Sequence, residues 1–83
     1  MTHPDQDELA AAPVFDAGHM GCGELVMLLR MRLKADPGRL FCVIALDSGA
    51  PEDLPAWCRM TGNALVHHDA AAARYWIRSR LQW

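Results

Sequence analysis

The sequence predicts an α+β fold, a two-layer α/β sandwich in which two helices cover one face of a four-stranded mixed sheet. Three observations carry this prediction. Apolar residues after residue 24 recur with helical spacing, residues 40–46 are apolar without interruption, and two strand-like segments near the C-terminus flank a short loop. The elements follow the order β-α-β-α-β-β. Two helices on one sheet face would bury both apolar helix stripes against the sheet.

The chain is long enough for one domain only. With 83 residues, a division into two parts would leave neither part with a hydrophobic core. Residues 1–11 are polar and then rich in alanine, with no periodic pattern, so we expect a flexible N-terminal tail there. The single domain is therefore expected to span residues 12–83.

The first half of the domain contains a strand, a helix and a second strand. Residues 13–16 read as a short extended segment, and the three glycines in residues 17–23 indicate a loop. From Glu24 the apolar residues recur with helical spacing, and the helix is expected to end before Pro37. Residues 40–46 then form a strand that is buried on both faces.

The second half predicts a helix and a hairpin. A helix is expected over residues 52–61, with Gly62 as its C-terminal stop. Residues 64–68 and 74–78 have the composition of strands, and residues 69–73 between them form the hairpin loop.

Composition and charge exclude several classes of function. A net charge of −2, with scattered basic residues, gives no basic face for a nucleic acid. No segment approaches the roughly 20 apolar residues needed to cross a bilayer, and the acidic first residues predict no secretory signal. The three cysteines, Cys22, Cys42 and Cys58, have no paired spacing, so a disulfide framework is not expected and the cytoplasm is the expected location.

One segment carries a family signature. Residues 16–25 read Asp-Ala-Gly-His-Met-Gly-Cys-Gly-Glu-Leu. They resemble the sequence Asp-x-Arg-Gly-Leu-x-Cys-Pro-x-Pro of the TusA/SirA-like sulfur carriers, with Asp16 and Cys22 aligned and Met20 in place of leucine. Both prolines of that signature are replaced here, by Gly23 and Leu25. The resemblance extends over roughly residues 12–80, through Pro37-Gly38, Asp47, Asp53-Leu54-Pro55-Ala56-Trp57-Cys58, Thr61-Gly62-Asn63 and Tyr75-Trp76-Ile77-Arg78.

The resemblance implies a function in sulfur transfer. In this family the signature cysteine accepts a persulfide sulfur from a cysteine desulfurase, or another sulfur donor protein, and passes it to an acceptor protein. That role falls on Cys22 alone, and no cofactor is implied. If active, the chain would thus be a persulfide carrier of the sulfurtransferase type. The alternative is a divergent member without efficient transfer that acts as a protein-binding or regulatory module. The missing prolines favour this alternative, and the retained Cys22 favours the carrier.

The chemistry expected of Cys22 depends on its place at the start of the first helix. Sulfur transfer needs a thiolate, and the unpaired N–H groups at a helix N-terminus favour an anion. The charge of Glu24 opposes this effect, and His19 would support it if protonated. We therefore predict a modestly lowered pKa for an exposed Cys22 thiol.

Other reactive side chains have simpler explanations. Cys42 and Cys58 lie in apolar segments and are expected in the core. His19 and Cys22 provide two ligands, fewer than the four of a structural zinc site, so no metal is expected. Asp47 and Asp53 could form a paired-carboxylate acid/base site, but their positions near a helix start favour capping.

Overall fold

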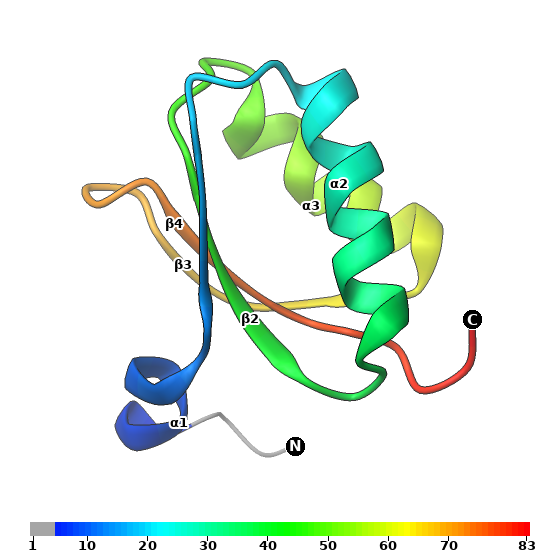
Figure 1. Cartoon of the computed structure of the whole chain (residues 1–83). Coiled ribbons are helices and arrows are strands. Elements are labelled where there is room, and N and C mark those ends of the chain that lie inside the picture. Colours follow the sequence, from blue (N-terminus) through cyan, green and yellow to red (C-terminus); the bar gives the residue numbers. More distant parts are fainter. Residues whose placement is uncertain (1–4) are drawn as a thin grey trace.

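The computed structural model describes residues 5–83 and shows a four-stranded sheet with two long helices on one face (Figure 1). The predicted α+β sandwich and its β-α-β-α-β-β order are confirmed. Residues 1–4, the beginning of the predicted tail, lie outside the described residues. The elements are α1 (Gln6–Ala11), β1 (Val14–Gly18), α2 (Cys22–Ala35), β2 (Leu40–Ala45), α3 (Ala50–Thr61), β3 (Ala64–Asp69) and β4 (Arg74–Arg78).

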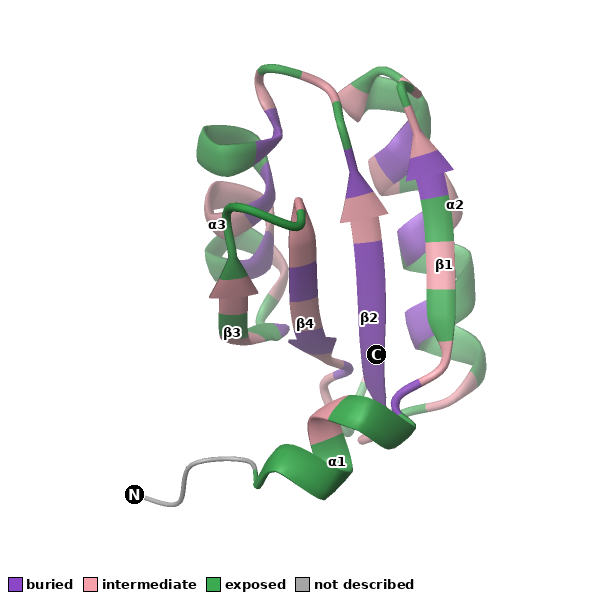
Figure 2. Ribbon diagram, turned by 90° about the vertical axis from the view of Figure 1, so that its left-hand side faces the viewer, coloured by how far each residue is buried: buried purple, intermediate pink, exposed green. Residues whose placement is uncertain are grey.

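The sheet is mixed, as predicted, and its strand order is β1-β2-β4-β3. β1 and β2 are parallel, whereas β4 is antiparallel to both β2 and β3. A parallel pair cannot be joined by a tight turn, and α2 provides the crossover between β1 and β2. The two parallel strands therefore end at the same edge of the sheet (Figure 2). This edge is where the loops that precede α2 and α3 meet.

The main core lies between the two long helices and the sheet. Leu25, Leu29 and Leu33 recur at four-residue intervals and give α2 one fully buried face. Every second residue of the central strands points to the same side, because side chains alternate across a strand. The buried residues that complete this core are Ala17, Phe41, Val43, Ala45, Ala50, Leu54, Cys58, Tyr75 and Ile77.

Helix α3 ends at the residue that the sequence predicts. Gly62 has a φ of 79°, in the left-handed region that suits glycine, and its N–H donates to the carbonyl of Cys58 at 3.0 Å. Both long helices begin two residues earlier than predicted, α2 at Cys22 and α3 at Ala50. Cys22 is consequently the first residue of its helix.

The C-terminal segment, residues 79–83, closes the end of the sheet where β2 begins. The buried hydroxyl of Ser79 donates to the carbonyl of Leu33 at 2.5 Å and accepts from the indole N–H of Trp83 at 3.1 Å. Arg80 donates from its backbone N–H to the Asn63 side chain at 2.9 Å. We call this region, residues 79–83 with Leu33 and Asn63, the closed end.

Helix α1 is a correction to the sequence-based expectation of a tail without secondary structure. Its first turn is capped by Asp5, which accepts from the Glu8 N–H at 2.7 Å. The Leu9 carbonyl accepts from the indole N–H of Trp76 at 2.9 Å, and Glu8 pairs with Arg78 at 2.9 Å. These partners lie far along the chain, where no local pattern in residues 5–11 reveals them. We propose that residues 12–83 remain the one domain, with α1 as an accessory helix on the other sheet face.

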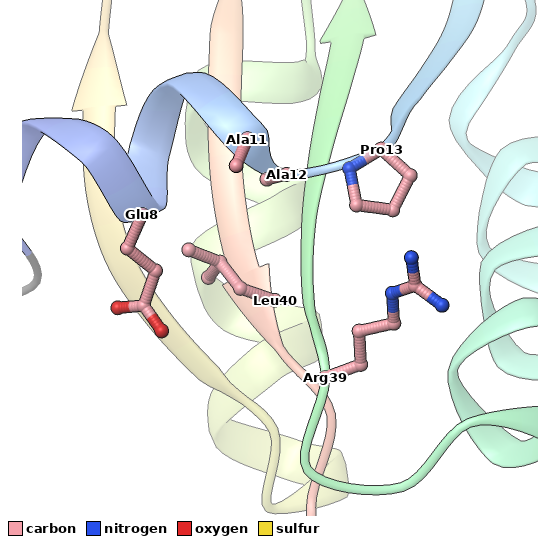
Figure 3. Close-up of a pocket in the computed structure, with 6 residues that line it drawn as sticks. All are labelled: Glu8, Ala11, Ala12, Pro13, Arg39 and Leu40. Atoms are coloured by element: carbon pink, nitrogen blue, oxygen red, sulfur yellow. The ribbon is translucent and has the colours of Figure 1, made fainter.

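A pocket of about 190 Å³ lies between α1 and the beginning of β2 (Figure 3). Glu8 and Arg39 supply its charged groups, and its other lining residues are Ala11, Ala12, Pro13 and Leu40. It lies at the opposite end of the sheet from the beginning of α2 (Figure 1). No cysteine or histidine lines it, so it offers no nucleophile.

Candidate functional site

Cys22 lies at the mouth of α2, in the loop region that follows β1. Gly21 precedes it as the N-cap residue and offers no side chain to cap the helix. A β-carbon placed on Gly21 or Gly23 would have no atom within 4 Å, so the space on either side of Cys22 is open. The Cys22 side chain itself is half-buried. The expected exposure is thus only partly realised, but a partner could approach this sulfur.

The Cys22 thiol has a hydrogen-bond partner from a distant part of the chain. Its Sγ donates to Oδ2 of Asp47 at 3.2 Å. Asp47 follows β2, and the parallel pairing of β1 with β2 brings this position next to the loop before α2. Close by, the Leu46 N–H donates to the Gly18 carbonyl at 2.8 Å, which ties the two strand ends together. The sheet topology therefore creates this contact across 25 residues.

A second carboxylate converges on the same place. Oδ2 of Asp47 accepts from the Gly49 N–H at 3.1 Å, and Asp53 reaches the same glycine from the first turn of α3. A β-carbon at Gly49 would lie 3.2 Å from the Asp47 oxygen and 3.0 Å from the Asp53 oxygen. A side chain at this position would therefore crowd both carboxylates. We call Cys22, Asp47, Gly49 and Asp53 the thiol end.

The prediction that Asp47 and Asp53 cap the helix now labelled α3 is wrong. Gly49 occupies the N-cap position of α3, and no side chain makes a cap hydrogen bond there. Asp47 instead orders the turn before the helix and accepts from Cys22. The sequence does contain one indication of this contact: Asp47 directly follows the predicted buried strand. Side chains that follow parallel strands gather at one edge of a sheet.

The predicted modest lowering of the Cys22 pKa is also wrong. The pKa of this thiol is raised from 9.0 to about 12, by burial first and then by the hydrogen bond to Asp47 and the negative charges of Asp47 and Asp53. Of these carboxylates, only Asp47 has the distance and angles of a hydrogen bond to the sulfur within the described part of the chain. The sequence-based prediction considered the helix end, Glu24 and His19 but not these two carboxylates.

Tyr75 lies on the buried side of the thiol end. Burial raises the pKa of its hydroxyl, and the charge that Cys22 would carry as a thiolate raises it further. The ring of His68 stacks on the Tyr75 ring, with centroids 4.2 Å apart. With its pKa raised to about 12, Cys22 is a protonated thiol in the free protein at neutral pH.

The remaining candidates lie elsewhere. Cys42 and Cys58 are buried, as predicted, with 1% and 2% of their surface exposed. Burial also raises the pKa of Cys58 to about 11. His19 is exposed on the loop before α2. Over residues 5–83, no three His, Cys, Asp or Glu side chains are grouped so that they could hold a metal ion.

The chain resembles known proteins over nearly all of its length, although it matches no family model. It is 35% identical over 83 residues to the sulfur carrier protein TusA of Pseudomonas paraeruginosa, an alignment that covers 96% of the chain and 98% of the relative. The chain belongs to the TusA family. The TusA proteins of Pseudomonas fluorescens, 35% identical over 81 residues, and Pseudomonas aeruginosa, 36% identical over 70 residues, support the same assignment. They are covered to 95% and 89% of their lengths.

Membership of the TusA family agrees with the fold of the chain. The predicted resemblance to the TusA family is thereby confirmed, and the α+β sandwich is consistent with the SirA-like fold. Across residues 5–83, no helix has the length and apolar character needed to cross a membrane.

Proposed function

We propose that this chain is a sulfur carrier that holds one sulfur atom as a persulfide on Cys22. One observation carries the proposal: Cys22 is half-buried beside open space at the mouth of α2, whereas Cys42 and Cys58 are buried. The TusA relatives are sulfur carrier proteins by name and support the same role. A carrier needs a sulfur atom that both a donor and an acceptor can reach, and Cys22 meets this requirement best.

The transfer is a thiol exchange without net oxidation. The Cys22 thiol loses its proton to water, and the thiolate attacks the terminal sulfur of a persulfide on the donor. A bond forms between the Cys22 sulfur and that terminal sulfur, the sulfur–sulfur bond of the donor breaks, and the donor cysteine leaves as a thiolate that takes up a proton. In the second step an acceptor thiolate attacks the outer sulfur of the loaded Cys22. The acceptor gains this sulfur, and Cys22 leaves as a thiolate that takes up a proton. No organic cofactor enters the balance.

The partners follow from this chemistry. The donor is a protein that carries a persulfide, such as a cysteine desulfurase, and the acceptor is a protein with a reactive thiol. The chain is proposed to act in the cytoplasm, where its three free cysteines would stay reduced. Neither a nucleic acid nor a membrane is proposed as a direct partner.

The proposal is tested by loading the protein with sulfur and measuring its intact mass. The chain is incubated with a cysteine desulfurase and cysteine, or with polysulfide, and the expected product carries the mass of added sulfur. Cys22→Ser should gain none, whereas Cys58→Ala, the matched control at a buried thiol, should load like the wild type. A folded wild-type chain that takes up no sulfur from either source would rule out the carrier function.

The second candidate is a protein-binding or regulatory module built on the same surface. Two observations favour it: the signature prolines are replaced by Gly23 and Leu25, and the pKa of Cys22 is raised to about 12. A module of this kind would bind a partner protein equally well with Cys22→Ser as with the wild type. Loss of partner binding in that variant, together with sulfur uptake by the wild type, would exclude it.

A further inference from the structure

The contact between Cys22 and Asp47 has a consequence for the carrier function proposed above, on which the following inference rests. The sulfur donates to Oδ2 of Asp47 at 3.2 Å, so the contact needs the proton on the sulfur. A thiolate in the same position would face a carboxylate with no hydrogen between the two atoms. The hydrogen bond therefore exists for the thiol and is lost for the thiolate.

The position of Asp47 is fixed by more than this contact. Its Oδ2 also accepts from the Gly49 N–H at 3.1 Å. Asp47 is half-buried and directly follows Leu46, whose N–H donates to the Gly18 carbonyl. Asp53 adds a second carboxylate next to Gly49, 3.0 Å from where a β-carbon would lie. The carboxylate thus lies beside the sulfur because of the fold of its own turn.

We propose that Asp47 is a lock on the reactivity of Cys22: its hydrogen bond and charge keep the sulfur as a thiol in the free protein, so that small electrophiles and oxidants react slowly. Thiolate is the form that alkylating agents, peroxides and persulfides all consume. Acceptance of sulfur from a donor then requires that the contact between Sγ and Oδ2 be broken. Asp47 acts through Cys22 and is a positioning residue.

The lock distinguishes a carrier from an ordinary reactive thiol. A low-pKa cysteine would react with any electrophile in its surroundings, including those that oxidise it irreversibly. A thiol that is held by Asp47 is protected until a partner protein changes its surroundings. Protection of the empty carrier and selectivity for the proper donor would follow from the same contact.

The test is the rate of alkylation of Cys22 by iodoacetamide as a function of pH, measured by mass on the Cys22 peptide. Asp47→Asn keeps the size of the side chain and an oxygen for the Gly49 N–H but removes the charge. The groups that face the sulfur are Asp47 from the β2–α3 turn, Asp53 from α3 and Tyr75 from β4. Asp47→Asn leaves the other two in place, so a changed pH profile reports on Asp47.

A pKa lowered by one unit raises the thiolate fraction about tenfold and lowers its intrinsic nucleophilicity about threefold. We therefore expect Asp47→Asn to react at least about threefold faster than the wild type at pH 8, with a profile displaced to lower pH. Asp53→Asn should show a smaller increase. Glu52→Gln, the matched control, changes the same charge on an exposed side chain of the same helix and should react at the wild-type rate.

Equal rates and equal pH profiles for Asp47→Asn and the wild type would overturn the lock. An increase of the same size in Glu52→Gln would also overturn it, because the effect would then be one of general charge. Sulfur loading of the wild type is measured in parallel. A wild type that loads while Asp47→Asn shows no faster alkylation refutes the lock alone. Faster alkylation in a protein that never loads supports the lock and refutes the carrier function.

Discussion

At the closed end of the sheet, the buried hydroxyl of Ser79 is paired in the interior, whereas at the thiol end two carboxylates lie near a half-buried sulfur beside open space. The buried hydroxyl of Ser79 satisfies both the Leu33 carbonyl and the Trp83 indole. Cys22, by contrast, has open space on both sides of its backbone and a carboxylate against its sulfur. The difference teaches that a buried, paired hydroxyl and the candidate reactive thiol lie at opposite ends of the same sheet.

The largest expected effect on stability comes from the closed end. Ser79→Ala leaves the Leu33 carbonyl and the Trp83 N–H without their buried partner, which costs about 1–3 kcal/mol in the free energy of unfolding. Denaturant unfolding, followed by tryptophan fluorescence, measures this loss. The alkylation rate of Cys22 should stay at the wild-type value, because the change lies at the other end of the sheet.

Ser48→Ala is the matched control, since Ser48 is exposed in the loop that precedes α3. Its free energy of unfolding should differ from the wild type by less than about 0.5 kcal/mol. If Ser79→Ala unfolded at the wild-type denaturant concentration, or if it changed the reactivity of Cys22, the separation between the two ends would be lost.

A smaller effect is expected where α1 covers the other face of the sheet. Trp76→Phe removes the indole N–H that donates to the Leu9 carbonyl but keeps an aromatic ring next to His67. The loss of one such hydrogen bond is expected to cost about 1 kcal/mol. Amide hydrogen exchange in α1 should become faster while exchange in α2 stays unchanged. Unchanged exchange in α1 would show that this contact does not hold the helix in place.

A pH-dependent effect on stability is expected from the titration of Cys22. Below pH 9 the thiol is protonated in both the folded and the unfolded chain, and its full contribution to stability is present. Between pH 9 and about 12 the unfolded chain loses this proton while the folded chain retains it, so the free energy of unfolding falls as the pH rises. The difference between the wild type and Cys22→Ser isolates this effect, because Cys58 and Tyr75 titrate in both proteins.

Unfolding by denaturant at pH 8 and pH 10 measures that difference. The stability of the wild type should fall relative to Cys22→Ser over this interval. A wild type that gained stability relative to the variant would mean that the fold favours the thiolate, contrary to the contact with Asp47.

The sequence predicted the elements that depend on local patterns. The continuous apolar run indicated β2, and the two strand-like segments around residues 69–73 indicated the hairpin of β3 and β4. α1 could not be predicted in this way, because a helix of six residues is too short to be stable on its own and depends on Trp76 and Arg78. Its contacts bridge most of the chain.

The site was predicted only in part, for a similar reason. The family signature identified Cys22, but its chemical surroundings come from Asp47 and Asp53, which reach it only when β1 and β2 pair in parallel. No local sequence pattern predicts the order of the strands in the sheet. The direction of the Cys22 pKa was therefore predicted wrongly, although the residue itself was identified as the candidate site.

The most direct test of the account is to locate the sulfur on the loaded protein by peptide mass mapping. The native chain is loaded by a cysteine desulfurase, its free thiols are blocked, and the peptides that contain Cys22, Cys42 and Cys58 are compared. The account predicts added sulfur on the Cys22 peptide alone. Sulfur on the peptides of the buried cysteines, or on none of the three, would contradict it.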